Sequence, residues 1–418
     1  MVRRFALGFI ILSLVTCHWL SAQDSLDIKI GQMILIGFPK AEVDKTVLEE
    51  IRQGKVGSII LFEKNIPPKN SFHALKKITW TYQQAASIPL LIAIDQEGGR
   101  VNRLKEKYGF PRSVTAAQLG KMPLDSVRFY SETTAATLAG LGINVNFAPV
   151  VDLASNPNNP IIAKVERAYS ANPDSVALYA KEVIKAHRKI GVITTLKHFP
   201  GHGSSKDDTH LGIADVSNTW NETELVPYRA LIQQGYVDAI MTAHIVNKKL
   251  DDSGNPGTLS GKMINDLLRK KLNYNGVVFS DDMQMHAIAK HYGLEEAIKL
   301  SILAGVDILT FSNNISGSQE RTVDVVHRII RKFVQDGTIP QARIDQAYNR
   351  ILALKRKLSQ TSAEYYREQL VEAKKEVLKA EEISRDNVRR ATESEKSAQE
   401  AYEKLKEQQP KSKKKKKN

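Results

Sequence analysis

Residues 192–203 read Val-Ile-Thr-Thr-Leu-Lys-His-Phe-Pro-Gly-His-Gly. The first five are β-branched or apolar and predict a buried strand. A lysine and two histidines follow at once in a Gly/Pro-rich bend, and Asp208 and His210 come a few residues later. Such a density of ionisable side chains at the end of a strand predicts a reactive loop carried by a rigid scaffold.

Three interpretations of this loop compete. Gly201 and Gly203 supply turn chemistry, which would suit a polar surface turn. A metal site is the second, because His and Asp bind zinc or manganese, although the sequence has no HExxH, HxH or Cys pair. The third is proton transfer, with Asp208 orienting one ring nitrogen of His210 while the other faces a substrate. Histidines beside a lysine favour proton transfer, and neither a metal nor a cofactor is expected.

Short apolar, β-branched runs recur along the chain and alternate with stretches of helical spacing. Near-continuous Val/Ile/Leu runs are typical of parallel strands that are buried on both faces. The 418 residues suffice for one large α/β domain. Alternation over about 320 residues favours a single (β/α)8 TIM-type barrel, with a doubly wound open sheet as the alternative. The eight runs are 33–38, 56–62, 89–95, 143–149, 192–197, 237–244, 277–281 and 306–311.

Ionisable residues stand where five of these runs end. In a barrel the active site lies at the C-terminal ends of the strands, so we expect these side chains to face one mouth. They are Asp95, Asp152, Lys197 with His198, His244, and Asp281.

The spelling KHFPGHG at 197–203, followed after four residues by Asp-Thr-His at 208–210, resembles the acid/base loop of glycoside hydrolase family 3. The resemblance is to its NagZ-type β-N-acetylglucosaminidase branch, which usually has Ser where this chain has Thr209. Residues 95–103 (DQEGGRVNR) and 276–283 (GVVFSDDM) match the same branch. The resemblance spans roughly residues 28–358 and implies a TIM-type barrel with β-N-acetylglucosaminidase activity.

The resemblance also assigns roles by position. It implies that Asp281 is the nucleophile, His210 the general acid/base and Asp208 the residue that orients His210. Carboxylates and guanidinium groups form directional hydrogen bonds to vicinal hydroxyls, and structural ion pairs beneath the loops are the alternative role for such residues. The residues implied for holding the sugar are Asp95, Arg103, Arg167, Lys197 and His198.

A second carboxylate, Asp282, follows Asp281 directly. Successive strand side chains point to opposite sides, so both cannot face one substrate atom. We expect Asp282 to cap a helix that begins around Met283. The adjacent pair leaves open a substrate-assisted route in which the acetamido group attacks. A nucleophile on a strand and an acid/base on a distant loop fit double displacement better, with water or, as an alternative, phosphate as the acceptor.

The first residues have the order of a secretory signal. Two arginines precede an apolar run over 5–15, and small residues at 21–22 come before Gln23. The run is shorter than the roughly 20 residues of a membrane span. We therefore expect residues 1–22 to be removed and the enzyme to be periplasmic or envelope-associated. Cys17, the sole cysteine, falls in this segment, where a lipid anchor is the alternative.

The composition changes again after the expected catalytic domain, 23–358. Residues 359–410 are rich in Glu, Lys, Ala and Gln and predict a long solvated helix. A coiled coil is the less favoured alternative, because polar residues interrupt the heptad after Ile383. Residues 411–418 form a basic tail expected to be disordered. The formal net charge is +14, but no recognition motif accompanies the lysines, so an anionic envelope surface is a more natural partner than nucleic acid.

Two classes of function remain. The first is an exported hydrolase that removes terminal β-linked N-acetylglucosamine from peptidoglycan fragments, such as muropeptides, or from related amino-sugar glycans. The second is a non-catalytic envelope protein that binds glycans. Asp208, His210 and Asp281 together favour the first. A β-glucosidase-type or phosphorolytic activity within the same family is a further alternative, and a monomer is expected.

Overall fold

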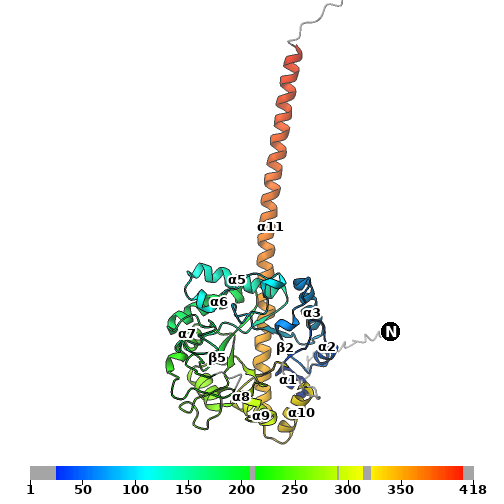
Figure 1. The fold of residues 1–418 in the computed structure, drawn as a ribbon. Coiled ribbons are helices and arrows are strands. Elements are labelled where there is room, and N and C mark those ends of the chain that lie inside the picture. Colours follow the sequence, from blue (N-terminus) through cyan, green and yellow to red (C-terminus); the bar gives the residue numbers. More distant parts are fainter. Residues whose placement is uncertain (1–24, 208–211, 290, 314–321, 408–418) are drawn as a thin grey trace, which may run out of the picture.

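Eight parallel strands close into a barrel in the order β1-β10-β9-β7-β5-β4-β3-β2 (Figure 1). The computed structural model describes residues 25–207, 212–289, 291–313 and 322–407, and no helix in this part is long and apolar enough to cross a membrane. The closed barrel confirms the predicted fold and excludes the open sheet. The expected signal segment 1–22 with Cys17, and the basic tail 411–418, lie outside the described residues.

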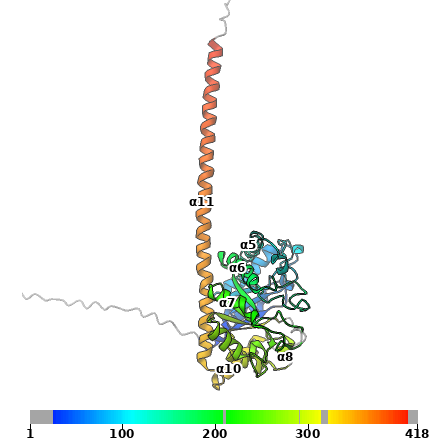
Figure 2. The ribbon, with the colours of Figure 1, turned by 90° about the vertical axis from the view of Figure 1, so that its left-hand side faces the viewer.

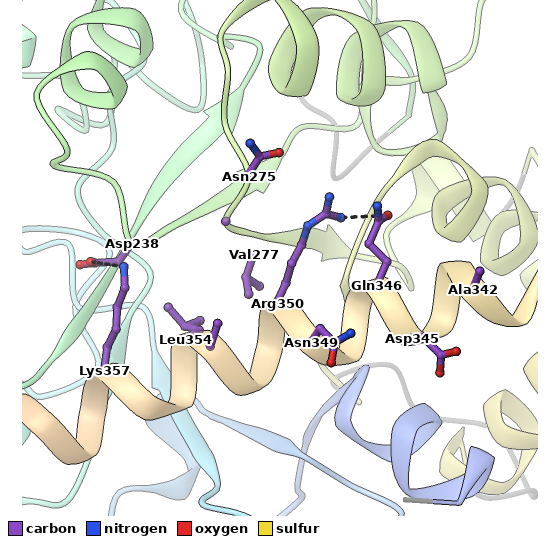
Figure 3. Close-up of a pocket in the computed structure, with 12 residues that line it drawn as sticks. Asp238, Asn275, Val277, Ala342, Asp345, Gln346, Asn349, Arg350, Leu354 and Lys357 are labelled. Atoms are coloured by element: carbon purple, nitrogen blue, oxygen red, sulfur yellow. Dashed lines mark hydrogen bonds and ion pairs between the residues drawn. The ribbon is translucent and has the colours of Figure 1, made fainter. Parts of the chain in front are cut away.

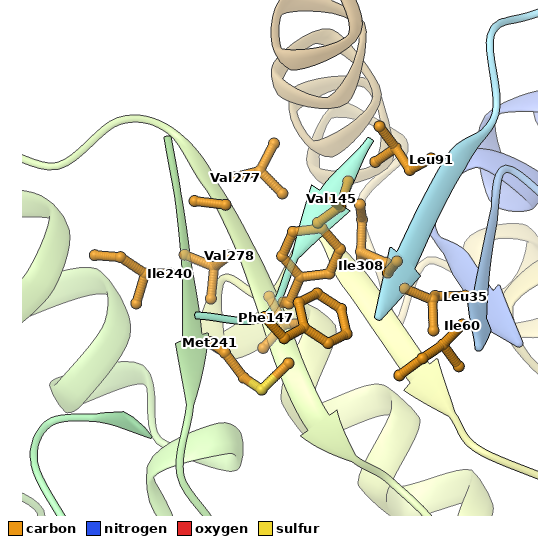
Figure 4. Close-up of a cluster of buried hydrophobic side chains, with 14 of the residues drawn as sticks. Leu35, Ile60, Leu91, Val145, Phe147, Ile240, Met241, Val277, Val278 and Ile308 are labelled. Atoms are coloured by element: carbon orange, nitrogen blue, oxygen red, sulfur yellow. The ribbon is translucent and has the colours of Figure 1, made fainter. Parts of the chain in front are cut away.

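Each barrel strand overlaps one of the eight predicted apolar runs. Their side chains are buried because the strands face the barrel interior on one side and the helices on the other. Ile60, Val145 and Ile308, from three different strands, belong to one buried cluster (Figure 4). The strands are β1 (Ile34–Gly37), β2 (Ser58–Leu61), β3 (Leu91–Ile94), β4 (Val145–Asn146), β5 (Ile193–Phe199), β7 (Ala239–Thr242), β9 (Val277–Asp282) and β10 (Ile308–Phe311).

Helices surround the barrel, and two short strands, β6 (Ala214–Asp215) and β8 (Ile245–Val246), pair separately. Polar caps fix several helix starts; the side chain of Asp44, for example, accepts from the amides of Thr46 and Val47 before the second helix. The helices are α1 (Leu26–Gln32), α2 (Lys45–Arg52), η1 (Glu63–Asn65), α3 (Ser71–Ala85), η2 (Glu106–Tyr108), α4 (Ala116–Leu119), α5 (Leu124–Gly140), α6 (Pro173–Lys189), η3 (Glu222–Leu225), α7 (Val226–Gln233), η4 (Gly257–Leu259), η5 (Lys262–Lys271), α8 (His286–Ala289), α9 (Leu294–Ala304), α10 (Thr322–Gln335) and α11 (Gln341–Glu407).

The first part of α11 lies across the N-terminal end of the barrel, where it forms a floor (Figure 2). Arg343 and Arg350 of α11 reach Asp307, just before β10, at 3.0 and 3.2 Å. Farther along the helix, Lys355 Nζ donates to the carbonyl of Gly57, just before β2, at 2.9 Å. Contacts near the start of two strands fix the direction in which the helix crosses the barrel.

A groove of about 550 Å³ runs beside this floor helix. Figure 3 shows Lys357 of α11 reaching toward Asp238, which lies before β7, with 3.9 Å between the charged atoms. The last buried side chain of α11 described near the barrel is that of Leu358. The helix does not end there: it continues to Glu407 and projects away from the barrel (Figures 1 and 2).

Candidate active site

A cavity of about 640 Å³ opens at the C-terminal ends of the barrel strands. Its walls come from segments at the ends of β2, β3, β4, β5, β7, β9 and β10. The expected acid/base pair, Asp208 and His210, lies outside the described residues. The expected site residues that the structure does describe all line this cavity: Asp95, Arg103, Arg167, Lys197, His198 and Asp281.

Asp95 directly follows β3 and lies between two cations. Its Oδ1 accepts from Lys197 Nζ at 2.7 Å, and its Oδ2 accepts from Arg103 Nη2 at 3.3 Å. Burial acts to raise the pKa of Asp95, but the two cations outweigh it and hold this pKa below its ordinary value. Asp95 is therefore a fixed anionic acceptor, the kind of group that binds a sugar hydroxyl.

Glu97 belongs to the same cluster, although no sequence argument singled it out. Its carboxylate accepts two hydrogen bonds from Arg167, each at 2.8 Å, and lies 2.6 Å from Lys197 Nζ. Burial acts to raise the pKa of Glu97, but Arg167 and Lys197 hold it well below its usual range. A signal was present in the sequence, because Glu97 stands two residues after Asp95 and such residues share one side of an extended chain.

The imidazole of His198 is fixed at both nitrogens. Nδ1 lies 2.6 Å from Asp152 Oδ2, and Nε2 lies 3.2 Å from Arg167 Nη2. A guanidinium group only donates, so Nε2 must accept and the proton resides on Nδ1. Burial acts to raise the pKa of Asp152, but His198 and His202 bring it below its ordinary value. The cavity wall thus presents His198 in one tautomer and one orientation.

Two of the ionisable residues at strand ends do not face the cavity. Asp152 is buried beneath His198 and also accepts from the backbone amides of His198 and His202, at 3.2 and 2.8 Å. His244 is buried beside β9, and its Nε2 donates to the carbonyl of Asp282 at 2.9 Å. The expectation that all five strand ends face one mouth is wrong for Asp152 and His244, because their side chains hold neighbouring loops instead.

Asp281 and Asp282 end β9, and both line the cavity. The amide of Asp282 donates to Asp281 Oδ1 at 2.8 Å. Asp282 Oδ1 in turn accepts from the amides of Gln284 and Ser312, each at 3.1 Å. Asp282 therefore holds the turn before α8, which begins at His286, later than the predicted helix start. Burial raises the pKa of Asp282.

The bend after β5 needs its glycines. A Cβ at Gly203 would lie 2.0 Å from the carbonyl oxygen of Leu153, and one at Gly201, where φ is 119°, would lie 2.5 Å from the Cβ of Glu224. The bend is thus packed against the segment after β4 and against η3.

Burial raises the pKa of Glu224 to about 8 and lowers the pKa of His202 to about 4, so both groups are uncharged near neutral pH.

The described part of the cavity combines acceptors and donors for a polyhydroxylated ligand with a carboxylate, Asp281, at the end of β9. Within the described ranges, no three His, Cys, Asp or Glu side chains are grouped so that they could hold a metal ion.

Comparison with known proteins adds the family. The profile described as glycosyl hydrolase family 3 N terminal domain matches residues 25–354. The chain is 37% identical over 291 residues to a β-hexosaminidase of Tolumonas auensis, covering 68% of this chain and 84% of that protein. It is 32% identical over 334 residues to β-hexosaminidase A of Pseudoalteromonas piscicida, covering 75% of this chain and 56% of that protein.

A solved structure gives the same answer. The glycoside hydrolase family 3 β-N-acetylglucosaminidase of Paenibacillus sp. str. FPU-7 superposes with a TM-score of 0.73 at 34% sequence identity, covering 81% of this chain and 63% of that one. The sequence match spans the whole barrel, and the solved structure shares its fold. The chain belongs to glycosyl hydrolase family 3.

Proposed function

We propose that this glycoside hydrolase is an exo-acting β-N-acetylhexosaminidase that removes terminal β-linked N-acetylglucosamine with retention of configuration. One observation carries the proposal: Asp281 lines the same cavity as the cluster of Asp95, Glu97, Arg167 and Lys197. In this proposal Asp281 is the reactive carboxylate and the cluster holds the sugar beside it. The names of the relatives, β-hexosaminidase and β-N-acetylglucosaminidase, support an amino sugar as the substrate.

The proposed reaction has two steps. In the first, the Asp281 carboxylate attacks the anomeric carbon, the glycosidic C–O bond breaks, and His210 gives its proton to the leaving oxygen. In the second, water attacks the same carbon, the bond to Asp281 breaks, and His210 takes the proton of the water. Asp208 orients His210 in both steps. A neutral imidazole also avoids a second anion beside the glycosyl ester.

Substrate binding follows from the ion pairs of the cluster. Asp95 is expected to accept from sugar hydroxyls, while Arg103, Arg167 and Lys197 donate to them. These groups are already paired with one another, so little side-chain freedom is lost when a sugar replaces water in the cavity. His198, whose Nε2 faces Arg167, is expected to complete the binding surface.

We further propose that the enzyme is exported and acts on peptidoglycan fragments or related amino-sugar glycans. The order of charge, apolar run and small residues in 1–22 supports export. The lysines at 413–417 are suited to an anionic envelope surface. Truncation after Leu358 is expected to release the enzyme from envelope fractions with unchanged activity on a small aryl glycoside. Loss of that activity would show that the extension belongs to the catalytic fold.

The catalytic proposal is tested with p-nitrophenyl N-acetyl-β-glucosaminide. Nitrophenol release is expected from the wild type and to fall to background in Asp281→Ala. Asp266→Asn, an exposed aspartate paired with Lys270, serves as the control and should keep full activity. Activity in Asp281→Ala equal to that of the control would refute the assignment. The same assay with aryl glycosides lacking the 2-acetamido group separates hexosaminidase from β-glucosidase activity.

The route is tested separately. Double displacement predicts that a slow fluorosugar substrate leaves a glycosyl mass on the peptide that contains Asp281. Turnover of the aryl glycoside without any such adduct would favour attack by the acetamido group of the substrate instead.

A further inference from the structure

The part of α11 beyond Leu358 is a long helix that projects away from the barrel (Figures 1 and 2). Val377 and Val388 are 57% and 64% exposed. Helices of globular proteins usually bury such residues, so two exposed valines on one side of this helix point to a missing neighbour. The spacing and the charges of this helix fit a second copy of the same chain as that neighbour.

One face of the extension carries residues at steps of three or four, which is the spacing of a coiled-coil seam. Steps of three and four alternate except at Ser384, where two steps of four follow one another and shift the heptad without ending it. Most of the residues are apolar and all are exposed. They are Val377, Ala380, Ser384, Val388, Ala391, Glu395, Ala398 and Tyr402. By sequence position alone the spacing also includes 363, 366, 370, 373 and 405.

This seam is symmetric about Ser384. Val377 and Ala391 lie seven residues to either side of it, and Ala380 and Val388 lie four. Two helices that run antiparallel about an axis at Ser384 would therefore pair Val377 with the partner's Ala391. They would also pair Ala380 with the partner's Val388. These two layers each set a valine against an alanine, which lets the two helices pack closely around the axis.

The length of the extension fits the same axis. Ser384 lies within one residue of the middle of residues 359–407, the part of α11 that follows Leu358, the last side chain of this helix described as buried. A partner centred on Ser384 would overlap residues 361–407 of this stretch, roughly 70 Å at 1.5 Å per residue, and would stop short of the barrel-packed part of α11.

Charge decides the orientation. In a parallel pair in register, Glu395 would face the partner's Glu395 within an apolar seam, and Glu376 would lie beside the partner's Glu381. In the antiparallel pair, Glu395 faces position 373, which is alanine. Glu381 then lies beside the partner's Arg385. The antiparallel arrangement thus removes both kinds of like-charge contact and adds a contact between opposite charges, which the twofold axis repeats.

We infer that two copies of this chain dimerise through an antiparallel coiled coil of residues 361–407 centred on Ser384. The full chain is then a dimer, contrary to the monomer expected from the sequence. The cavity opens at the C-terminal end of the barrel and α11 crosses the other end, so pairing leaves the cavity accessible.

The mass in solution tests the pairing. The chain from Gln23 onward is expected to have twice its formula mass by light scattering or sedimentation at micromolar concentration, and truncation after Leu358 to give a monomer. Val377→Glu places a charge in the seam and should give a monomer with unchanged helix content. Leu378→Glu is the matched control, because Leu378 is equally exposed, at 61%, but lies off the seam. A monomeric full chain, or dissociation by Leu378→Glu alone, would overturn the inference.

Disulfide trapping tests the orientation, since no cysteine follows Cys17. In the antiparallel pair, Val377→Cys and Ala391→Cys should form a disulfide with each other when the two variants are mixed, and neither should form one alone. A disulfide within either variant alone would indicate a parallel pair and refute the symmetry. None of these outcomes depends on glycosidase activity, so the dimer and the proposed function stand or fall separately.

Discussion

Replacing Glu97 with glutamine tests whether charge holds the cluster behind the sugar site. The side chain of Glu97 is 6% exposed, and its carboxylate accepts two hydrogen bonds from Arg167 and forms an ion pair with Lys197. Glutamine keeps the shape but not the charge. Its amide oxygen accepts from one cation, while its amide nitrogen, a donor, is brought against another donor. Asp95 then remains as the one carboxylate of the cluster, beside Arg167, Lys197 and its own partner Arg103.

The magnitude follows from these contacts. Removing one partner of a buried ion pair costs about 3–5 kcal/mol, and a hydrogen bond to a charged group contributes about 1.5–3 kcal/mol. Because Glu97→Gln retains one acceptor, we expect the free energy of unfolding to fall by about 3 kcal/mol. At roughly 2–4 °C per kcal/mol for a large domain, Tm falls by about 6–12 °C. Arg167 and Lys197 line the cavity, so kcat/KM should also fall, by at least about tenfold.

Glu63 supplies the matched control for stability. Its carboxylate is also paired with two lysines, Lys105 at 2.5 Å and Lys107 at 2.7 Å, but it is 32% exposed. Solvent screening limits such pairs to about 1 kcal/mol or less, so Glu63→Gln should change stability little. Urea unfolding at pH 7 gives both free energies. Equal losses below about 1 kcal/mol in the two variants would refute the argument from burial.

The remaining predictions concern buried groups near the site and in the floor. Asp152→Asn should leave the fold intact but move the His198 proton to Nε2, where it faces the Arg167 donors. We therefore expect kcat/KM to fall about a hundredfold, equal to about 2.7 kcal/mol. Activity within threefold of wild type would contradict the assigned tautomer. Burial raises the pKa of Glu224 from 4.5 to about 8, so between these pH values Glu224 keeps its proton in the folded chain and loses it in the unfolded chain. The free energy of unfolding should therefore fall by a few kcal/mol as the pH rises from 4.5 to 8. Urea unfolding of Glu224→Gln should lack that slope, and an unchanged slope would count against it. Burial lowers the pKa of Lys355 from 10.5 to about 7, so between these pH values Lys355 is neutral in the folded chain and charged in the unfolded chain. The free energy of unfolding should therefore rise as the pH rises from 7 to 10.5, and Lys355→Met should abolish the rise. Parallel slopes for Lys355→Met and wild type would refute this.

The barrel could be predicted from the sequence because its signal is local. Each strand is buried on both faces, so its residues are apolar without interruption, and eight such runs can be counted. The residues at the strand ends could be named for the same reason. Their directions could not, because the loops set them: Asp152 turns beneath His198, and His244 toward the backbone of Asp282. Pairings such as Glu97 with Arg167, seventy residues apart, depend on barrel closure and leave no local pattern.

In the C-terminal extension, the composition changes at a position where the secondary structure does not. The change of composition after residue 358 suggested a boundary, yet α11 passes through this position without a break. No glycine or proline occurs between Gln341 and Glu407, so nothing in the chain stops the helix. Leu358 is buried, whereas the described side chains of 375–404 are exposed, so the same helix has the barrel as its neighbour in one part and solvent in another. Amino-acid composition predicts which part of a helix is buried. Where the helix begins and ends is predicted by its capping residues and by glycine and proline.

A helix that starts in the barrel floor is a rigid base for an assembly surface. Arg269 of η5 and Arg343 and Arg350 of α11 all bind the buried carboxylate of Asp307, so the helix is tied to the start of β10 by charge as well as by apolar packing. Breaking such a buried network costs several kcal/mol. The direction of the extension is therefore set by the same contacts that close the barrel. The candidate active site lies at the C-terminal end of the barrel, whereas this helix crosses the N-terminal end. Because the two are separate, the assembly of the chain can change without a change in its active site.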